Sequence, residues 1–194
     1  MASRYDRPAA GTAARPVTTA GQAPTIVVPD PSLVLLIGVT GSGKSTFAAR
    51  HFRPTQVLSS DAFRALVADD ENDQEATADA FELLHRAVDR RLARHRLTVV
   101  DATNVQASAR RPLLDAARDH LVPAVAVVFD LPARVTATRN AARAGRTVPA
   151  AIHQRQGRAL RRSLQELPRE GFAAIWLLRS PEAIDRTIVG SAGS

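Results

Sequence analysis

The stretch GVTGSGKST at residues 38–46 matches the pattern G-x-x-x-x-G-K-[ST], which binds the phosphates of a nucleoside triphosphate. Glycines in such a loop let successive backbone N–H groups approach the β-phosphate closely. The ammonium of Lys44 then reaches the β- and γ-phosphates, and the hydroxyl of Ser45 is a ligand for the Mg²⁺ that bridges them. The nucleotide-binding residues predicted in this loop are Thr40, Gly41, Ser42, Gly43, Lys44, Ser45 and Thr46.

Lys44 is the single lysine among the 26 lysine and arginine residues of the chain. A compact ammonium fits a tight phosphate-binding turn, whereas a planar guanidinium does not. The absence of a second lysine excludes the Asn-Lys-x-Asp sequence with which GTPases read guanine. The segment LTVVDATN contains one acid, Asp101, and not the run of adjacent acids typical of motor-type ATPases.

The segment SSDAFRAL at residues 59–66 provides a candidate site for a phosphate acceptor. Asp61 follows a predicted strand at the carboxyl edge of the sheet, where open α/β folds bind ligands. A carboxylate there can accept the proton of an incoming hydroxyl and orient it toward the γ-phosphorus. Arg64 lies one helical turn later and can bind a phosphate of the acceptor. The alternative is that Ser60 or Asp61 only caps the following helix.

A second arginine set occurs in RVTATRNAARAGRTVP at residues 134–149. Arg139 and Arg143 are four residues apart and therefore share one helix face. Gly145 and Pro149 indicate a break before the next helix, so the pattern predicts a lid that closes over the nucleotide. Lid arginines would neutralise charge that develops on the transferring phosphoryl group, and the alternative is a solvated basic helix face.

Short apolar, β-branched runs alternate with longer helical patterns, which is typical of a parallel sheet covered on both faces. We therefore predict an α/β P-loop kinase fold, with a central, mainly parallel sheet flanked by helices, adenylate-kinase-like and with a helical lid. The predicted strands are 25–28, 33–37, 56–60, 97–101, 124–130 and 174–178, and the predicted helices are 44–51, 61–67, 75–96, 106–120, 132–144 and 150–166.

Composition favours one domain over residues 25–190, preceded by a disordered tail over residues 1–24 that is rich in Ala, Pro, Thr and Gly. The net charge of +7 favours a polyanionic partner, although the charge also fits a merely solvated basic surface. The chain has no cysteine, which excludes disulfides and thiolate metal sites. No secretory signal or apolar run of membrane-spanning length is found, so we expect a cytoplasmic protein without a membrane partner.

The sequence resembles the 5′-hydroxyl polynucleotide kinase domain of the bacterial Pnkp RNA-repair enzymes over about residues 25–183. The resemblance lies in the segments SLVLLIGVTGSGKSTFAARHF, SSDAFRALVADDENDQ, LTVVDATNVQASARRPL, AVAVVFDLPARV, RNAAR and LPREGF with LLRSPE. It implies that Asp61 is the general base toward the 5′-OH and that Arg64 contacts the adjacent phosphate. Lys44, Arg139 and Arg143 would contact the donor phosphates, with Lys44 and Arg139 assisting catalysis.

The resemblance further implies an activity: transfer of the γ-phosphate of ATP, or another NTP, to the 5′-OH of single-stranded or end-exposed RNA or DNA, with Mg²⁺ bound by Ser45. The segment DATN at residues 101–104 is also shared with this family. We expect Asp101 near a water bound to Mg²⁺, and Thr103 and Asn104 at the edge of the sheet. The family's phosphatase and ligase modules are absent here, so we expect a stand-alone kinase or an excised domain. Two alternatives remain: a kinase of a small-molecule hydroxyl, and a non-catalytic, nucleotide-gated RNA-binding module.

Overall fold

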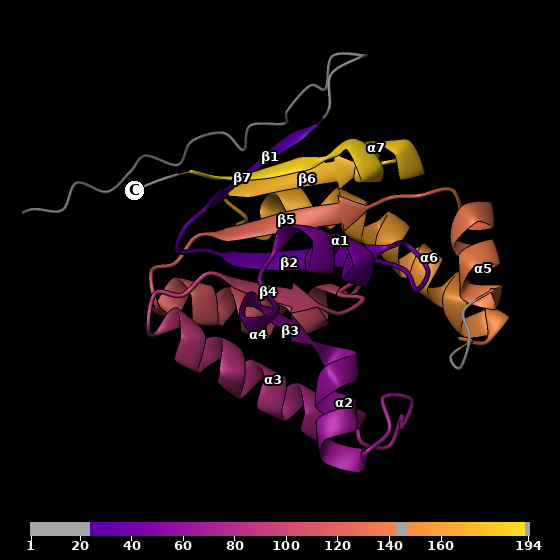
Figure 1. Cartoon of the computed structure of the whole chain (residues 1–194), viewed down its shortest axis with the longest axis horizontal. Helices are drawn as coiled ribbons and strands as arrows, with labels where there is room; N and C mark the ends of the chain where they lie inside the picture. Colours follow the sequence, from indigo (N-terminus) through magenta and orange to yellow (C-terminus); the bar gives the residue numbers. More distant parts are fainter. Residues whose placement is uncertain (1–23, 143–146, 193–194) are drawn as a thin grey trace, which may run out of the picture.

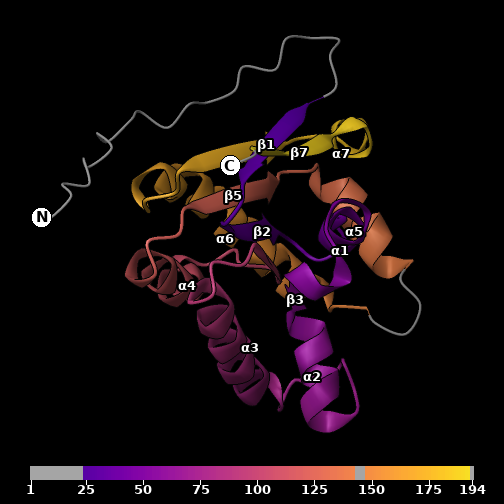
Figure 2. The ribbon, with the colours of Figure 1, turned by 60° about the vertical axis from the view of Figure 1, so that its left-hand side comes forward.

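The computed structural model describes residues 24–142 and 147–192. Its elements form a parallel sheet with helices on both faces, and a small second sheet lies beside them (Figures 1 and 2). The predicted tail at residues 1–24, apart from its last residue, and the predicted lid residue Arg143 lie outside the described residues.

The central sheet has five parallel strands in the order β3-β4-β2-β5-β6. Every residue of β2 and β5 is buried, because helices cover both faces, and such strands read as continuous apolar runs. In a parallel sheet all carboxyl ends meet at one edge, so the loops after β2, β3 and β4 lie close together. The strands are β2 (Leu33–Gly38), β3 (Val57–Ser59), β4 (Thr98–Asp101), β5 (Ala124–Phe129) and β6 (Ala174–Leu178).

Alternating side chains of β2 enter two separate hydrophobic cores. Leu33, Leu35 and Ile37 pack in the core beneath α3, α4 and α6, whereas Val34 and Leu36 pack in the core that includes residues of α1 and α7. The helices are α1 (Lys44–His51), α2 (Ser60–Ala68), α3 (Thr77–Leu92), α4 (Ala107–Asp119), α5 (Ala133–Ala141), α6 (Ala150–Glu166) and α7 (Pro181–Arg186), with 3₁₀ turns at Pro54–Gln56 and Leu167–Arg169.

The structure confirms the predicted α/β class, and the central sheet is wholly parallel. The six predicted strands and six predicted helices are all present. The ends of α1, α6 and β6 are as predicted, and the ends of the others are shifted. The largest shift is in α3, predicted over 75–96 and observed over Thr77–Leu92, because Asp73 and its neighbours form a turn before it and His95 adopts a positive φ after it. Leu84, Val88 and Leu92 recur at four-residue spacing on α3 and form a fully buried stripe.

One strand does not lie where the sequence pattern suggested. The segment at β1 (Thr25–Pro29) is a strand, but it pairs in parallel with β7 (Ile188–Ala192) in a separate two-stranded sheet. The sequence did not predict β7 or α7, because both are short and their apolar residues are few. Ile26 and Val28 of β1 face the core shared with α1 and α7, which explains why this strand joins that layer.

Candidate functional site

The loop between β2 and α1 has the backbone that a phosphate-binding turn requires. Gly41 and Gly43 have φ of 80° and 94°, in the left-handed region that favours glycine. Gly43 is the N-cap of α1 and makes no side-chain cap bond, so the amino end of the helix opens toward the adjacent cleft. The helix begins at Lys44, which sets the motif's lysine at the positive end of the helix dipole.

Gly41 also packs against α5. A Cβ added to Gly41 would lie 2.5 Å from the carbonyl oxygen of Thr136 and 3.1 Å from the backbone nitrogen of Asn140. At Gly43, an added Cβ would lie 3.7 Å from Nη1 of Arg139. The helix that was predicted to form the lid therefore lies directly on the phosphate-binding loop.

The ammonium of Lys44 lies inside the turn, and the residue as a whole is 7% exposed. Its Nζ donates to the carbonyl oxygens of Gly38 at 2.9 Å and Val39 at 3.0 Å, and lies 3.4 Å from Oγ of Ser42. These bonds hold a compact cation beneath the loop. The predicted reason for a lysine at this position is consistent with these contacts.

A cleft of about 970 Å³ collects most of the residues predicted from sequence. Its lining includes Lys44, Ser45, Thr46, Asp61, Arg64 and Arg139. Thr40, Gly41 and Gly43 line it as well, whereas Ser42 is fully buried, with its N–H donating to Val39. The structure thus brings the loop, the acceptor segment and α5 together around one cavity.

Asp61 lies in the first turn of α2, immediately after β3. The N-cap of this helix is Ser59, whose Oγ accepts from the backbone N–H of Asp61 at 3.3 Å. The alternative that Ser60 or Asp61 serves as the cap is therefore wrong. The Asp61 carboxylate forms an ion pair with Arg64, and its side chain is 24% exposed at the cleft.

Arg64 is almost fully buried, with a side chain 5% exposed. Its Nε donates to the carbonyl oxygen of Glu71 at 2.8 Å, and its Nη2 donates to the Asp61 carboxylate. The arginine therefore joins α2 to the loop that follows it and orients the Asp61 carboxylate, while its guanidinium also lines the cleft.

The DATN segment continues this edge of the sheet. Asp101 ends β4, is paired in register with Leu36 of β2 and Ser59 of β3, and lines the cleft. Thr103 also lines the cleft, and its carbonyl oxygen accepts from the N–H of Gly38 at 3.0 Å. Asn104 is 2% exposed and donates from Nδ2 to Leu36, so its role is to fix this loop against β2.

Arg139 on α5 lines the cleft, whereas its predicted partner Arg143 is outside the described residues. The neighbouring Asn140 exchanges two bonds with Val148: Nδ2 donates to the carbonyl oxygen at 2.8 Å and Oδ1 accepts from the N–H at 3.1 Å. Asn140 therefore fastens the segment before α6 to α5, beside the cleft.

A carboxyl on α7, that of Glu182, has a lowered pKa to which Arg139 contributes weakly. The pKa of Glu182 is lowered, first by a hydrogen bond from its own backbone N–H, then by the Ser180 hydroxyl and, more weakly, by the charge of Arg139. Burial raises the pKa and is a larger influence than the charge of Arg139. The ionised carboxylate thus lies within electrostatic reach of the predicted lid arginine.

Sequence reasoning missed Gln156 of α6. Its Oε1 accepts from the backbone N–H of Thr40 at 3.0 Å, and the residue lines the cleft between loop and helix. No motif marked this glutamine, because the contact joins positions 116 residues apart and depends on how α6 packs. Ile152 of the same helix also lines the cleft.

The oxygen groups beside the loop fit a magnesium ion. Ser45 is exposed at the cleft and Asp101 ends the neighbouring strand, and hydroxyl and carboxylate oxygens are ligands that Mg²⁺ prefers. Within residues 24–142 and 147–192, no three His, Cys, Asp or Glu side chains form a cluster that can hold a metal.

Comparison with known proteins agrees with this architecture. Residues 33–167, from β2 to the 3₁₀ turn after α6, match the model of a family described as an AAA domain. No curated protein matches the sequence. No helix in the described part of the chain combines the length and apolarity needed to cross a bilayer.

Solved structures share the fold at low identity. A chain of the Pnkp1/Rnl/Hen1 RNA repair complex aligns with a TM-score of 0.61 and 22% identity, over 72% of this chain and 47% of that one. A putative kinase from Chloroflexus aurantiacus aligns with a TM-score of 0.54 and 13% identity, over 77% of this chain and 88% of that one. A gluconokinase from Sinorhizobium meliloti 1021 aligns with a TM-score of 0.50 and 22% identity, over 82% of this chain and 90% of that one. This chain therefore spans about half the length of the repair-complex chain and most of the other two.

Proposed function

The chain belongs to the AAA domain family, and we propose that it is a P-loop kinase that transfers the γ-phosphate of ATP, or another NTP, to the 5′-OH end of RNA or DNA. The observation that carries this proposal is the shared cleft: the Asp61 carboxylate and the loop with Lys44 and Ser45 line one cavity. A phosphoryl acceptor and a triphosphate need to meet in such an arrangement.

In the proposed reaction, Asp61 accepts the proton of the acceptor hydroxyl. The hydroxyl oxygen forms a bond to the γ-phosphorus while the bond between that phosphorus and the β-phosphate oxygen breaks, so a nucleoside diphosphate leaves. Arg64 holds the carboxylate of Asp61 through their ion pair. Lys44 and Arg139 stabilise the negative charge on the phosphates, and a Mg²⁺ held by Ser45 would neutralise more of that charge.

The polynucleotide acceptor is supported by the resemblance of the loop, acceptor and lid segments to 5′-hydroxyl kinase domains, and by a net charge of +7 that suits a polyanion. The fold is also that of a chain from an RNA repair complex. Phosphatase and ligase modules, which this sequence does not contain, are the partners that the same repair would need.

A kinase of a small-molecule hydroxyl is the second candidate. The cleft volume of about 970 Å³ falls within the range that encloses small ligands, about 300–1,000 Å³. The alignment with the gluconokinase covers 90% of that protein's chain, so this fold makes up most of a small-molecule kinase. The acceptor therefore has to be identified by experiment.

Phosphate transfer from radiolabelled ATP to a panel of acceptors separates the candidates. We expect transfer to 5′-OH RNA and DNA oligonucleotides and little to gluconate, other sugars or nucleosides. Asp61→Asn should lower the transfer rate by about 10²- to 10⁴-fold, because the proton acceptor is lost, while ATP binding is kept. Asp79→Asn, an exposed carboxylate on α3 away from the cleft, is the matched control.

Transfer to a sugar or nucleoside without transfer to an oligonucleotide would favour the small-molecule kinase. Unchanged transfer in the Asp61→Asn variant would show that Asp61 is not the base. Binding of ATP and RNA by the natural chain, without transfer to any acceptor, would identify a non-catalytic RNA-binding module.

A further inference from the structure

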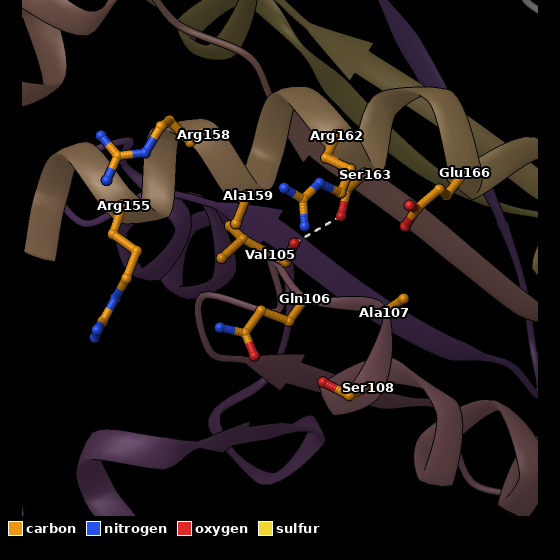
Figure 3. Close-up of a pocket in the computed structure, with 10 residues that line it drawn as sticks. All are labelled: Val105, Gln106, Ala107, Ser108, Arg155, Arg158, Ala159, Arg162, Ser163 and Glu166. Carbon is orange, nitrogen blue, oxygen red and sulfur yellow. Dashed lines mark hydrogen bonds between the residues drawn. The ribbon is translucent and has the colours of Figure 1, made fainter.

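A second cavity, of about 440 Å³, lies outside the cleft between the start of α4 and the outer side of α6 (Figure 3). We call it the α4–α6 groove and define it by Gln106 and Ser108 on one wall and by Arg155, Arg158 and Arg162 on the other. The roles proposed above use none of these residues. The groove is therefore a separate candidate binding surface.

The three arginines give the groove its charge. They are at positions i, i+3 and i+7 of α6, so they follow one face of the helix over about 10 Å. All three side chains are exposed, and within residues 24–142 and 147–192 none of them makes an ion pair or hydrogen bond. Glu166, at the end of α6, is the one acid in the lining.

A buried network holds the two walls in place. Arg110 of α4 is fully buried, and its Nη1 donates to the carbonyl oxygen of Asn104 at 2.7 Å and to Oγ of Ser163 at 3.1 Å. Its Nε and Nη2 bind the carboxylate of Glu170, which follows α6. Ser163 donates onward to the carbonyl oxygen of Val105 at 2.6 Å (Figure 3). These bonds tie α4 to α6, so the groove is preformed.

The opposite wall is polar but uncharged. The amide of Gln106 and the hydroxyl of Ser108 lie at the start of α4, across the groove from α6 (Figure 3). Both groups can donate hydrogen bonds to phosphate oxygens, as amides and hydroxyls do in nucleic-acid complexes. No aromatic side chain lines the groove, so it offers no platform on which a base can stack.

The groove lies beside the proposed active-site cleft, and the two cavities are lined by neighbouring residues of the same segments. Gln156 lines the cleft, and the preceding residue on α6, Arg155, lines the groove. On the other side, Thr103 lines the cleft and Val105 lines the groove. The same two segments therefore border both cavities, so a strand too long for the cleft has to cross one of these segments to reach the groove.

We propose that the α4–α6 groove binds the phosphates of a single-stranded polynucleotide acceptor, several nucleotides from its 5′ end. The inference rests on the proposed function, since it gives the strand that enters the cleft a further path. The arginines span about 10 Å of α6, a length over which they can contact consecutive phosphates of one strand. One guanidinium group can donate two parallel hydrogen bonds to the oxygens of one phosphate. Because such contacts reach only the sugar-phosphate backbone of the nucleic acid, the binding is independent of base sequence.

The test compares two triple variants with equal loss of charge. One is Arg155→Gln, Arg158→Gln, Arg162→Gln, and the control is Arg94→Gln, Arg161→Gln, Arg169→Gln, which are exposed arginines outside both cavities. Fluorescence anisotropy measures binding of 5′-OH single strands of 2 and 12 nucleotides at several salt concentrations. Circular dichroism and thermal melting check that both variants fold.

For the 12-mer, we expect the groove variant to bind about tenfold or more weakly than the control variant. The slope of log affinity against log salt should fall by about 2, since each phosphate contact on a single strand contributes about 0.7. Binding of the dinucleotide should be equal in the two variants, because it does not reach the groove.

Equal 12-mer affinity and equal salt slope in the two variants would overturn the proposal that the groove binds the strand. A loss of dinucleotide affinity in the groove variant as large as its loss of 12-mer affinity would overturn it as well. A polyglutamate peptide that competes as well as the 12-mer would identify an acidic protein as the ligand and also overturn it. Phosphate transfer is measured separately in the natural chain. A failure of the proposed kinase activity therefore gives a different result from a failure of the proposed groove.

Discussion

At the scale of single residues, Gly41 combines two requirements that no other residue type meets. Its φ of 80° is strained for any side chain, and its Cα faces the backbone of α5. Gly171 has a similar φ of 91°, but nothing lies within 4 Å of an added Cβ. The pair therefore separates the cost of backbone strain from the cost of steric overlap.

Replacing each glycine by alanine tests this distinction. Gly171→Ala should lower the free energy of unfolding by about 1–2 kcal/mol, the cost of a side chain at positive φ. Gly41→Ala should cost about 1–3 kcal/mol more, because the new methyl overlaps the carbonyl of Thr136, and ATP affinity should fall about tenfold or more. Urea unfolding and calorimetric ATP titration measure both effects. Equal destabilisation and unchanged ATP affinity would contradict the packing of α5 on the loop.

At the scale of elements, α3 places a histidine against its neighbours in the core layer. The ring of His85 stacks edge-on against Phe81 with centroids 6.0 Å apart, and its Nε2 is buried without a hydrogen-bond partner among the described residues. Burial lowers the pKa of His85 below the ordinary value of 6.5. The cause is that the charged imidazolium loses its hydration inside the protein.

The lowered pKa gives stability a defined pH dependence. Near pH 6.5 the unfolded chain binds more protons than the folded chain, so the free energy of unfolding rises with pH. The neutral His85 contributes fully to the free energy of unfolding above the pKa of the unfolded chain. This contribution is lost as the pH falls from about 6.5 toward the lowered pKa of His85 in the folded chain. His85→Gln should therefore flatten the curve of unfolding free energy between about pH 7 and 5.

Urea titrations of the natural chain and the variant across this range provide the measurement. Burial, with a smaller contribution from Arg50, also lowers the pKa of His51 on α1. The double variant His51→Gln, His85→Gln should therefore be flatter still. Parallel curves for the natural chain and both variants would exclude these two histidines as the cause of acid destabilisation.

At the scale of the whole molecule, the β1–β7 sheet joins the two ends of the described chain across the layer that contains α1 and α7. Ile26 of β1 is fully buried in that core, whereas its neighbour Val27 points outward and is 45% exposed. If this small sheet folds together with the central domain, a cavity in it should weaken the entire structure.

Ile26→Ala should lower the free energy of unfolding by about 2–5 kcal/mol, because it removes buried methyl groups and leaves a cavity. Val27→Ala, on the exposed side of the same strand, should cost less than about 1 kcal/mol. Thermal and urea unfolding followed by circular dichroism should show one transition shifted as a whole. A small separate transition in the Ile26→Ala variant, with the main transition unmoved, would mean that the sheet unfolds alone.

The site was predictable where chemistry resides in adjacent residues. The loop at residues 38–46 depends on glycines and one ammonium at fixed spacing, and a strand followed by a helix is the local context it needs. Asp61 was predictable because the strand before it ends at the sheet edge. Short continuous apolar runs predicted all five strands of the central sheet, since burial on both faces selects apolar residues at successive positions.

What the sequence by itself determined is therefore the α/β class and the phosphate-binding loop, because backbone conformation and burial act on neighbouring residues. Only the tertiary structure decided that β1 pairs with β7, that Gln156 binds the loop from α6, and that three arginines border a preformed groove. These features join segments far apart in the chain. Their positions depend on how the helices pack on the sheet, which no local spacing encodes.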